Sequence, residues 1–206
     1  MEDKIDEVVG AELSSLGFER TRPRHWVEAI RTPIRSIFEF QAIKGGAYSA
    51  RWGFSLDFVP LRRANDFQWK RTPKTAKFDL CIDPLDQHKM PLPDWFFIRR
   101  HEANDPIRLT AAAQESTRFA KLDFSRVSSI FDIVTIFRER ATMQFRRFSL
   151  ENYIQTDLAW GLSLIAIGDV PEGERHLELF CTRFSIDRND RFLQQAEATA
   201  KSIASF

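Results

Sequence analysis

Alternating apolar and polar positions predict two neighbouring strands in the first third of the chain. From Tyr48 to Phe58 the even-numbered positions carry large apolar residues or alanine, and the odd-numbered positions are small or charged. A period of two is typical of a strand with one buried face. Residues 34–43 show a noisier form of the same alternation. We therefore expect an antiparallel pair of strands that is joined through Gly45-Gly46.

The register of this hairpin tests whether the glycine pair binds a phosphate. A two-residue turn would place Phe40 opposite Arg51 and split the apolar face, whereas a three-residue turn at 44–46 or 45–47 aligns the two apolar faces. The first of these turns also places Glu39 opposite Arg51. Because a phosphate-binding glycine loop leads into a helix, and a strand follows here, the glycines predict a turn and no nucleotide site.

Other segments of the first half carry weaker signals. Residues 2–16 have helical spacing and Gly17 lies just past their end, which predicts a short amphipathic helix. A further strand is expected around 26–30, and a fourth over 77–83 with Phe78, Leu80 and Ile82 on one side. Residues 60–76 show no period and have prolines near both ends, so we expect a long irregular excursion over the surface.

From about Leu109 the apolar spacing becomes that of helices. Residues 127–148 are predicted as one long amphipathic helix, with Phe131 on its apolar side and Arg140 on its polar side. Residues 157–180 resemble one helical hairpin of a tetratricopeptide-type repeat. No second copy follows at the period of about 34 residues, so a solenoid is not expected. A terminal helix is predicted after Asp187.

Together these elements predict an α+β fold. An N-terminal helix would lie on an antiparallel sheet of about four strands, and a helical C-terminal half with the tetratricopeptide-like hairpin would follow. We expect a sheet domain over 1–105 and a helical extension over 106–206 packed on it, with one single domain as the alternative.

Composition indicates a folded protein of the cytoplasm. The chain has 206 residues, of which 43% are hydrophobic and 29% charged, far from the composition of disordered chains. No apolar run approaches the roughly 20 residues that span a membrane, and the first residues are acidic, unlike a secretory signal. Cys81 and Cys181 are far apart in sequence and flanked by apolar residues, which predicts two buried thiols.

Sequence motifs for catalysis are absent. None of the four histidines lies in a zinc-binding pattern, and no nucleophile elbow, phosphate loop or dinucleotide fingerprint occurs. We expect neither a metal nor a cofactor. His88 and His101 each lie near carboxylates that could orient an imidazole as a general base, so a hydrolase remains an alternative. A solvated loop histidine is the commoner outcome in such polar segments.

Arginines alternate with aromatic residues in three segments, 20–26, 62–74 and 95–101, and the last two are the candidate nucleic-acid-binding segments. Residues 61–149 carry 17 basic and 11 acidic side chains, and such mixtures can bind single-stranded nucleic acid by charge and stacking. Alternatively, the arginine stems cover apolar surface and the tryptophans belong to the core. The candidate binding residues are Arg51, Arg62, Arg63, Trp69, Lys70, Arg71, Arg99, Arg100 and His101.

The N-terminal third resembles an uncharacterised bacterial family of small α+β domains, catalogued as a domain of unknown function. The matching features are LGF at 16–18, Trp26, FEFQ at 38–41 and GGAYSARWGFSLDF at 45–58. Related domains resemble immunity proteins, which neutralise secreted toxins by direct binding. The C-terminal helices depart from the family, and the family supplies no catalytic residues.

The function that we expect is a non-catalytic protein-binding module, with an immunity-type role as its particular form. Arginine and aromatic residues are enriched at protein interfaces, which favours another protein as the partner. Single-strand nucleic-acid binding and an unrecognised hydrolase remain as alternatives. No membrane association is expected, and the sequence leaves the oligomeric state open.

Overall fold

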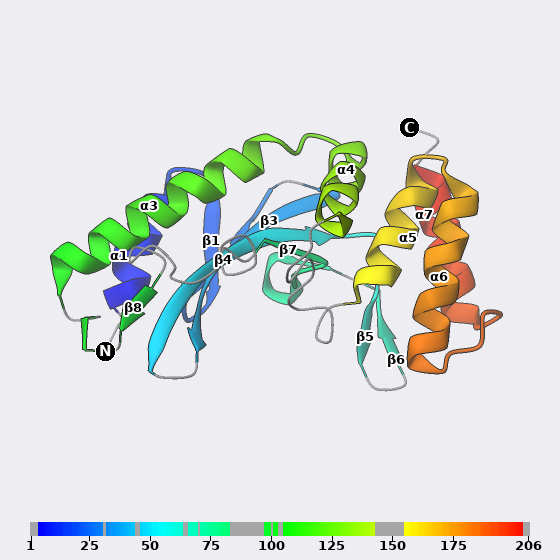
Figure 1. Cartoon of the computed structure of the whole chain (residues 1–206), viewed down its shortest axis with the longest axis horizontal. Helices are drawn as coiled ribbons and strands as arrows, with labels where there is room; N and C mark the ends of the chain where they lie inside the picture. The colour runs from blue at the N-terminus through cyan, green and yellow to red at the C-terminus, as the bar shows by residue number, and fades with distance from the viewer. Residues whose placement is uncertain are drawn as a thin grey trace.

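An antiparallel sheet, two helices on one of its faces and a helical C-terminal half make up the fold (Figure 1). The α+β prediction is confirmed. The computed structural model describes residues 4–30, 32–43, 46–63, 66–69, 71–82, 97–99, 101–102, 105–142 and 155–203.

The elements of the first half follow one another as a helix and then a series of strands. They are α1 (Lys4–Ser14), β1 (Phe18–Arg22), β2 (His25–Glu28), β3 (Ile34–Ile43), β4 (Ala47–Leu56), β5 (Leu61–Arg63), β6 (Asp66–Gln68), the 3-10 helix η1 (Pro73–Thr75), β7 (Leu80–Ile82) and β8 (Phe97–Arg99). The main sheet has six strands in the order β1-β2-β3-β4-β7, and β8 also pairs with β4. It thus extends the predicted four strands by β1 and β8. Strands β5 and β6 form a separate two-stranded sheet.

The β3–β4 hairpin has one of the two predicted registers in which the apolar faces of the two strands are aligned. Ile43 pairs with Ala47, so three residues, 44–46, separate the strands, and Glu39 lies opposite Arg51. Gly46 has a φ of +72°, a left-handed conformation that glycine adopts without steric cost. The predicted turn is confirmed, and β4 follows it directly.

The first face of the sheet, which α1 and α3 (Pro106–Ser125) cover, carries the aromatic core (Figure 1). Phe38 stacks on Trp52 across the hairpin, with ring centroids 6.3 Å apart. Near the end of α3, Phe124 packs on Phe54 of β4 at 5.8 Å. The indole nitrogen of Trp52 donates a 2.7 Å hydrogen bond to Asp123. Helix α3 is therefore held to the sheet by apolar packing and by one polar contact.

The segment between β4 and β7 differs from its prediction. Within 60–76 the structure has the β5–β6 hairpin and η1, not an irregular excursion. Strand β7 begins only at Leu80, and Phe78 packs with Val27 and Ile37 on the second face, the side of the sheet opposite α1 and α3. The alternation had placed Phe78 beside Leu80, but the chain before Leu80 is not a strand, so the period of two does not apply there.

The predicted long helix over 127–148 is also corrected. Helix α4 runs from Ile130 to Ala141, and residues 143–150 lie outside the described part of the chain. Ser129 caps it, since the hydroxyl accepts from the Asp132 N–H and the Asp132 carboxylate accepts in return. The side chain of Phe131 is 59% exposed and Arg140 is buried, the reverse of the prediction, because Ile133, Val134, Ile136, Phe137 and Arg140 form the packed side.

The C-terminal half is a hairpin of α5 (Thr156–Ala166) and α6 (Val170–Phe184), with α7 (Arg191–Ile203) packed on α5. Gly161 and Gly173 let α5 and α6 approach closely, because a Cβ on Gly173 would lie 2.8 Å from the Gly161 carbonyl oxygen. Phe192 of α7 contacts Phe67 of β6 at 5.6 Å. One cluster of buried apolar side chains includes residues of α1, the sheet and α7.

Candidate functional site

Charged side chains form a row across four strands on the second face of the sheet. Arg22 of β1 pairs with His25 of β2, His25 with Glu39 of β3, and Glu39 with Arg51 of β4. The Arg51 guanidinium donates two hydrogen bonds to Glu39, of 2.8 and 3.1 Å. It also lies 5.2 Å from the centroid of the Phe78 ring. Arg51, a predicted binding residue, is therefore engaged within the sheet.

His25 is the buried member of this row. Its Nδ1 atom lies 2.7 Å from the Thr21 hydroxyl oxygen, and its buried Nε2 atom has no hydrogen-bond partner among the residues that the structure describes. Burial lowers the pKa of His25 to about 4, and the charges of Arg22 and Arg51 act in the same direction. The imidazole is therefore neutral at physiological pH.

The buried His25 should make the protein less stable in mild acid. An unfolded histidine has a pKa of about 6.5, so between pH 6.5 and 4 the unfolded state binds a proton that the folded state does not. The contribution of His25 to the free energy of unfolding is therefore fully present above pH 6.5, and it decreases by about 3 kcal/mol as the pH falls towards 4. Urea unfolding of His25→Gln from pH 4.5 to 7.5 should show a smaller fall. His101→Gln, at an exposed site, should keep the original slope; equal slopes in all three proteins would contradict this origin.

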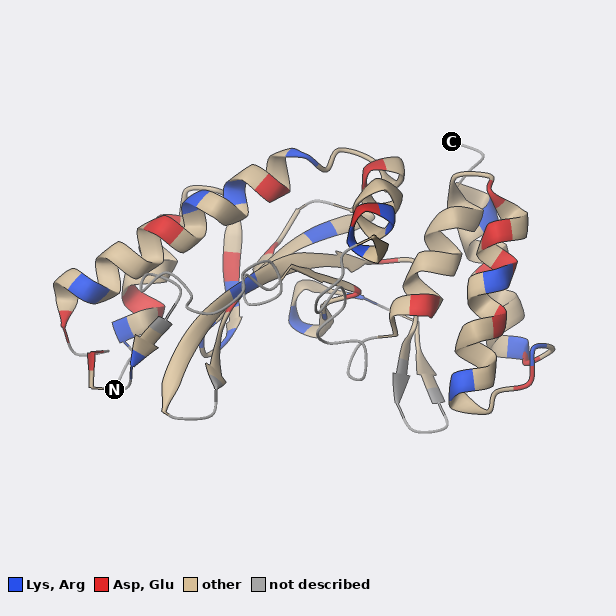
Figure 2. Cartoon of the chain, viewed as in Figure 1, with Lys and Arg blue, Asp and Glu red and all other residues tan. Residues whose placement is uncertain are grey.

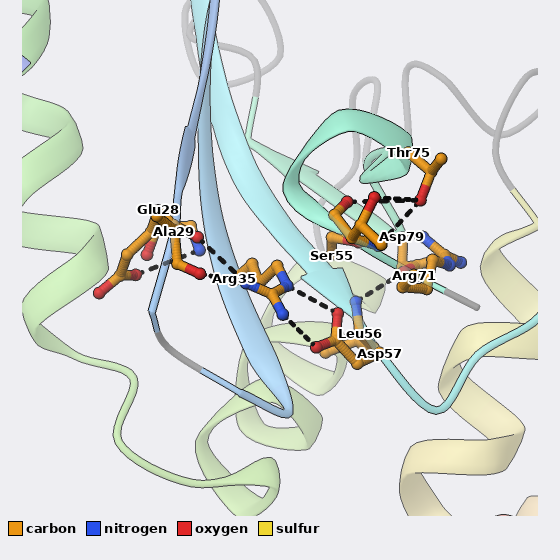
Figure 3. Close-up of polar contacts among 11 residues, drawn as sticks. Glu28, Ala29, Arg35, Ser55, Leu56, Asp57, Arg71, Thr75 and Asp79 are labelled. Carbon is orange, nitrogen blue, oxygen red and sulfur yellow. Dashed lines mark hydrogen bonds and ion pairs between the residues drawn. The ribbon is translucent and has the colours of Figure 1, made fainter. Parts of the chain in front are cut away.

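A second charged network lies at the other end of the same face (Figure 3). Arg35 holds Asp57 in a bidentate pair, with distances of 3.0 Å from Nε and 2.9 Å from Nη2. It also donates a 2.7 Å hydrogen bond to the carbonyl of Ala29. Asp79 accepts from Arg71 at 2.8 Å and from the backbone N–H of Leu56 at 2.7 Å.

The two carboxylates of this network have raised pKa values. Burial raises the pKa of Asp79 and of Asp57, and the arginines beside them partly offset this effect. Such values can mark a catalytic pair. Here, however, Arg35 binds the Asp57 carboxylate, and Arg71 and the Leu56 N–H bind the Asp79 carboxylate. No group of three or more potential metal ligands occurs among the described residues. The arrangement is suited to holding the 71–79 segment on the sheet.

A third polar cluster joins α5 to α6. His176 is buried, with Nδ1 3.2 Å from an oxygen of Asp157, and its ring stacks on Trp160 at 4.0 Å between centroids. Trp160 stacks in turn on Phe137 of α4 at 5.4 Å. The sequence analysis drew no attention to His176, although Glu172, whose carboxylate lies 3.8 Å from Nε2, is four positions earlier on the same helix; the nearer partner, Asp157, is nineteen positions away on α5.

The predicted binding residues that the structure describes lie in different parts of the fold. Arg71 is completely buried, and Trp69 is half-buried with its ring 6.3 Å from that of Phe192. Arg99 is exposed at the end of β8 and pairs with Ala47. For Arg62 and Arg63 the structure describes the backbone in β5 but not the side chains. Lys70, Arg100 and His88 lie outside the described residues, and His101 is exposed.

Trp69 and Arg71 thus have structural contacts that a bound single strand would have to replace. Trp69 already stacks on an internal ring, and the Arg71 guanidinium cannot reach a phosphate in solution. This placement agrees with the alternative in which arginine and aromatic residues of 62–74 belong to the protein's own packing.

The outer side of α3 carries a surface that the sequence analysis missed. Seven side chains lie at helical spacing on the side of α3 opposite the buried Leu109, and we call them the α3 outer strip: Ile107, Thr110, Ala111, Gln114, Arg118, Lys121 and Leu122. Six of them are exposed and Thr110 is half-buried, and the Gln114 amide donates a 3.4 Å hydrogen bond to Glu12 of α1. Ile107 is 81% exposed and Leu122 55% exposed. Pro106, Ile107, Thr110, Ala111 and Gln114 line a hollow of about 450 Å³ that is open to solvent. The sequence could have indicated this surface, because at helical spacing Ile107 and Leu122 lie on the side of the helix opposite Leu109.

Comparison of the chain with family models, curated proteins and solved structures gives no match in any of the three. The described helices include none that is both long enough and apolar enough to cross a membrane. Both cysteines are free and buried, as predicted.

Proposed function

We propose that the chain is a non-catalytic protein-binding module, with immunity-type neutralisation of a partner as its particular form. The observation that carries the proposal is the large exposed apolar side chain of Ile107 beside the open hollow on α3. Leu122 on α3 and Phe131 on α4 are further large apolar side chains that are exposed. Single exposed apolar residues are normal, but apolar side chains beside an open hollow on one helix are typical of interaction surfaces.

The state of the buried ionisable groups supports a binding role over catalysis. Asp57, Asp79 and Glu39 each accept hydrogen bonds from an arginine, and His176 lies against Asp157. A general base must reach the proton that it removes from a substrate, and these groups face internal partners instead. The immunity-type form rests on the resemblance of residues 5–60 to the family described above.

Capture of a partner by the immobilised chain should depend on Ile107. Ile107→Glu places a charge in the α3 hollow and should reduce the captured amount at least tenfold, the effect expected for a central apolar contact. Leu179→Glu is the matched control, because Leu179 is 46% exposed on α6; it should capture normally. An immunity-type role further requires that the chain inhibits the partner's own activity at a one-to-one ratio. Equal capture by all three proteins would exclude the α3 surface as the binding site.

The nucleic-acid alternative makes a different prediction for the same proteins. Filter binding to single-stranded DNA that falls steeply as salt rises would favour it, since phosphate contacts release counterions. Binding that is absent at low salt would exclude it.

A further inference from the structure

The α3 outer strip has two parts that differ in charge. Ile107, Thr110, Ala111 and Gln114 are uncharged and line the hollow, whereas Arg118 and Lys121 follow on the same side of the helix. Leu122 lies beside these two cations. The strip is therefore uncharged near the start of α3 and carries two cations towards its end, and Figure 2 shows acidic as well as basic positions along the same helix.

We propose that the α3 outer strip binds an amphipathic helix of a partner protein, with an apolar turn against Ile107 and Ala111 and acidic side chains against Arg118 and Lys121. This inference rests on the proposed protein-binding function and names the partner's chemistry at the same surface. An amphipathic helical partner presents apolar anchors at spacings of i, i+3, i+4 and i+7 to an uncharged surface, and the residues that line the hollow provide such a surface.

The shape of the strip favours a helix as the occupant. Ala111 is small and lies between Ile107 and Gln114, so a partner backbone can approach α3 closely there. With a rise of about 1.5 Å per residue, Arg118 lies about 16 Å and Lys121 about 21 Å along the axis from Ile107. A straight partner helix would therefore carry its acidic residues about three to four turns from its apolar turn.

The charges of the strip are available to a partner. Arg118 is paired with Glu115 at 2.8 Å, and both side chains are largely exposed, so this ion pair contributes little and can be exchanged for a partner carboxylate. Lys121 has no ion pair with any described residue. Arg126, at the end of α3, adds a further exposed cation, though it is paired with Glu139. An acidic partner thus fits this end better than a basic one.

Leu179 on α6 provides a contrast within the same molecule. It is also a large exposed apolar side chain, and its neighbours at i−4 and i+4 on α6 are the exposed Arg175 and Arg183. Leu179 therefore tests whether an exposed apolar side chain beside arginines is enough to bind the acidic peptide without the α3 hollow.

The test uses the full chain and three capped, fluorescein-labelled peptides of 22 residues. The two acidic peptides each carry leucines on one turn and glutamates 11 and 14 positions away from it; the glutamates follow the leucines in one peptide and precede them in the other. The third peptide has lysines in place of the glutamates. Anisotropy titrations at 50 and 300 mM NaCl should show one acidic peptide binding at least about tenfold more tightly than the basic peptide. Salt should weaken that binding, and the better acidic peptide defines the orientation of the two helices.

Variants of the chain separate the apolar contact from the charges. Ile107→Glu should weaken binding of the acidic peptide at least about tenfold, and Arg118→Glu/Lys121→Glu should make the chain prefer the basic peptide. Leu179→Glu should bind like the original protein. Thermal unfolding followed by circular dichroism confirms that each variant is folded.

Two results would overturn the inference: no saturable binding of either acidic peptide, or a peptide preference that the charge reversal leaves unchanged. If capture of a protein partner still depends on Ile107 in that case, the acidic helix is wrong and the protein-binding function stands. If capture is also independent of Ile107, α3 is not the binding surface, and the exposed apolar side chain on α3 no longer supports the proposed function.

Discussion

Replacing Arg71 by methionine should lower the free energy of unfolding by about 3–5 kcal/mol, the cost of leaving one member of a buried ion pair alone. The Arg71 side chain is completely buried. Its guanidinium donates to the Val59 carbonyl, to the Ser55 hydroxyl and to Asp79, at 2.8 to 2.9 Å. Methionine fills similar space but donates no hydrogen bond, so Asp79 would remain as an unpaired buried carboxylate.

The pH dependence of this loss identifies Asp79 as its cause. Burial already raises the pKa of Asp79, and removal of Arg71 raises it further. When folding raises the pKa of a carboxyl group, its contribution to the free energy of unfolding is largest below the pKa of the unfolded state, where the group is protonated in both states. That contribution is lost as the pH rises through the pKa of the folded state. The difference between Arg71→Met and the original protein in urea unfolding should therefore be smaller at pH 5 than at pH 8.

Two further variants control the Arg71 experiment. Arg71→Met/Asp79→Leu removes both charges and should recover much of the lost stability, because an apolar pair of similar volume can replace a buried ion pair. Arg118→Met removes an exposed arginine and should change stability by less than about 0.5 kcal/mol. If Arg71→Met were as harmless as Arg118→Met, the buried network would not stabilise the fold.

The hairpin could be predicted because its information is local. Alternation over 34–43 and 48–58 fixes which side chains share a face, and only a three-residue turn lets Phe38 and Phe40 meet the apolar side of β4. Of the two three-residue turns that the alternation allowed, the turn at 44–46 placed Glu39 opposite Arg51 and the turn at 45–47 placed Arg35 opposite Asp57; the structure has the first, with two hydrogen bonds from Arg51 to Glu39. Patterns of this kind need no knowledge of the rest of the molecule.

The segment from 60 to 79 could not be predicted for the opposite reason. A sequence rich in charge normally lies on the surface, and the burial of Arg71 depends on Ser55 and Asp79, which are sixteen and eight positions away and show no periodic relation to it. The strands β5 and β6 have three residues each, too few to show a period. Phe78 faces the second side because β7 begins only at Leu80.

The candidate surface on α3 was hidden by a similar ambiguity. The sequence shows helical spacing after Leu109, but Ile107 and Leu122 are apolar as well, so apolar residues occur on both sides of the helix. Only the packing of α3 on α1 and the sheet determines that Leu109 is buried and that Ile107 is exposed. In the same way, Phe131 is exposed although it is as apolar as the buried Phe137.

Gly53→Ala should cost about 3 kcal/mol or more, the upper range for inserting a methyl group into a packed interior. A Cβ at Gly53 would lie 2.1 Å from the carbonyl oxygen of Leu80 and 3.0 Å from the Cα of Cys81. Both atoms belong to the backbone of β7, so no side-chain rotation can relieve the overlap. Strand β7 would have to move away from β4, against the Asp79 carboxylate that accepts from Leu56 next to this pairing.

The matched control for Gly53 is Gly168→Ala. Gly168 has a φ of +88°, and a Cβ there would meet no atom within 4 Å, so this variant should lose only about 1 kcal/mol from backbone conformation. Urea unfolding measures both losses, and hydrogen exchange of the amides of β7 should increase in Gly53→Ala alone, since the displaced strand opens locally. Equal losses in the two variants, with unchanged exchange in β7, would mean that β4 and β7 are not in contact at Gly53. The segment that carries Asp79 would then have to be held on the sheet by the Arg71 network, without close strand pairing.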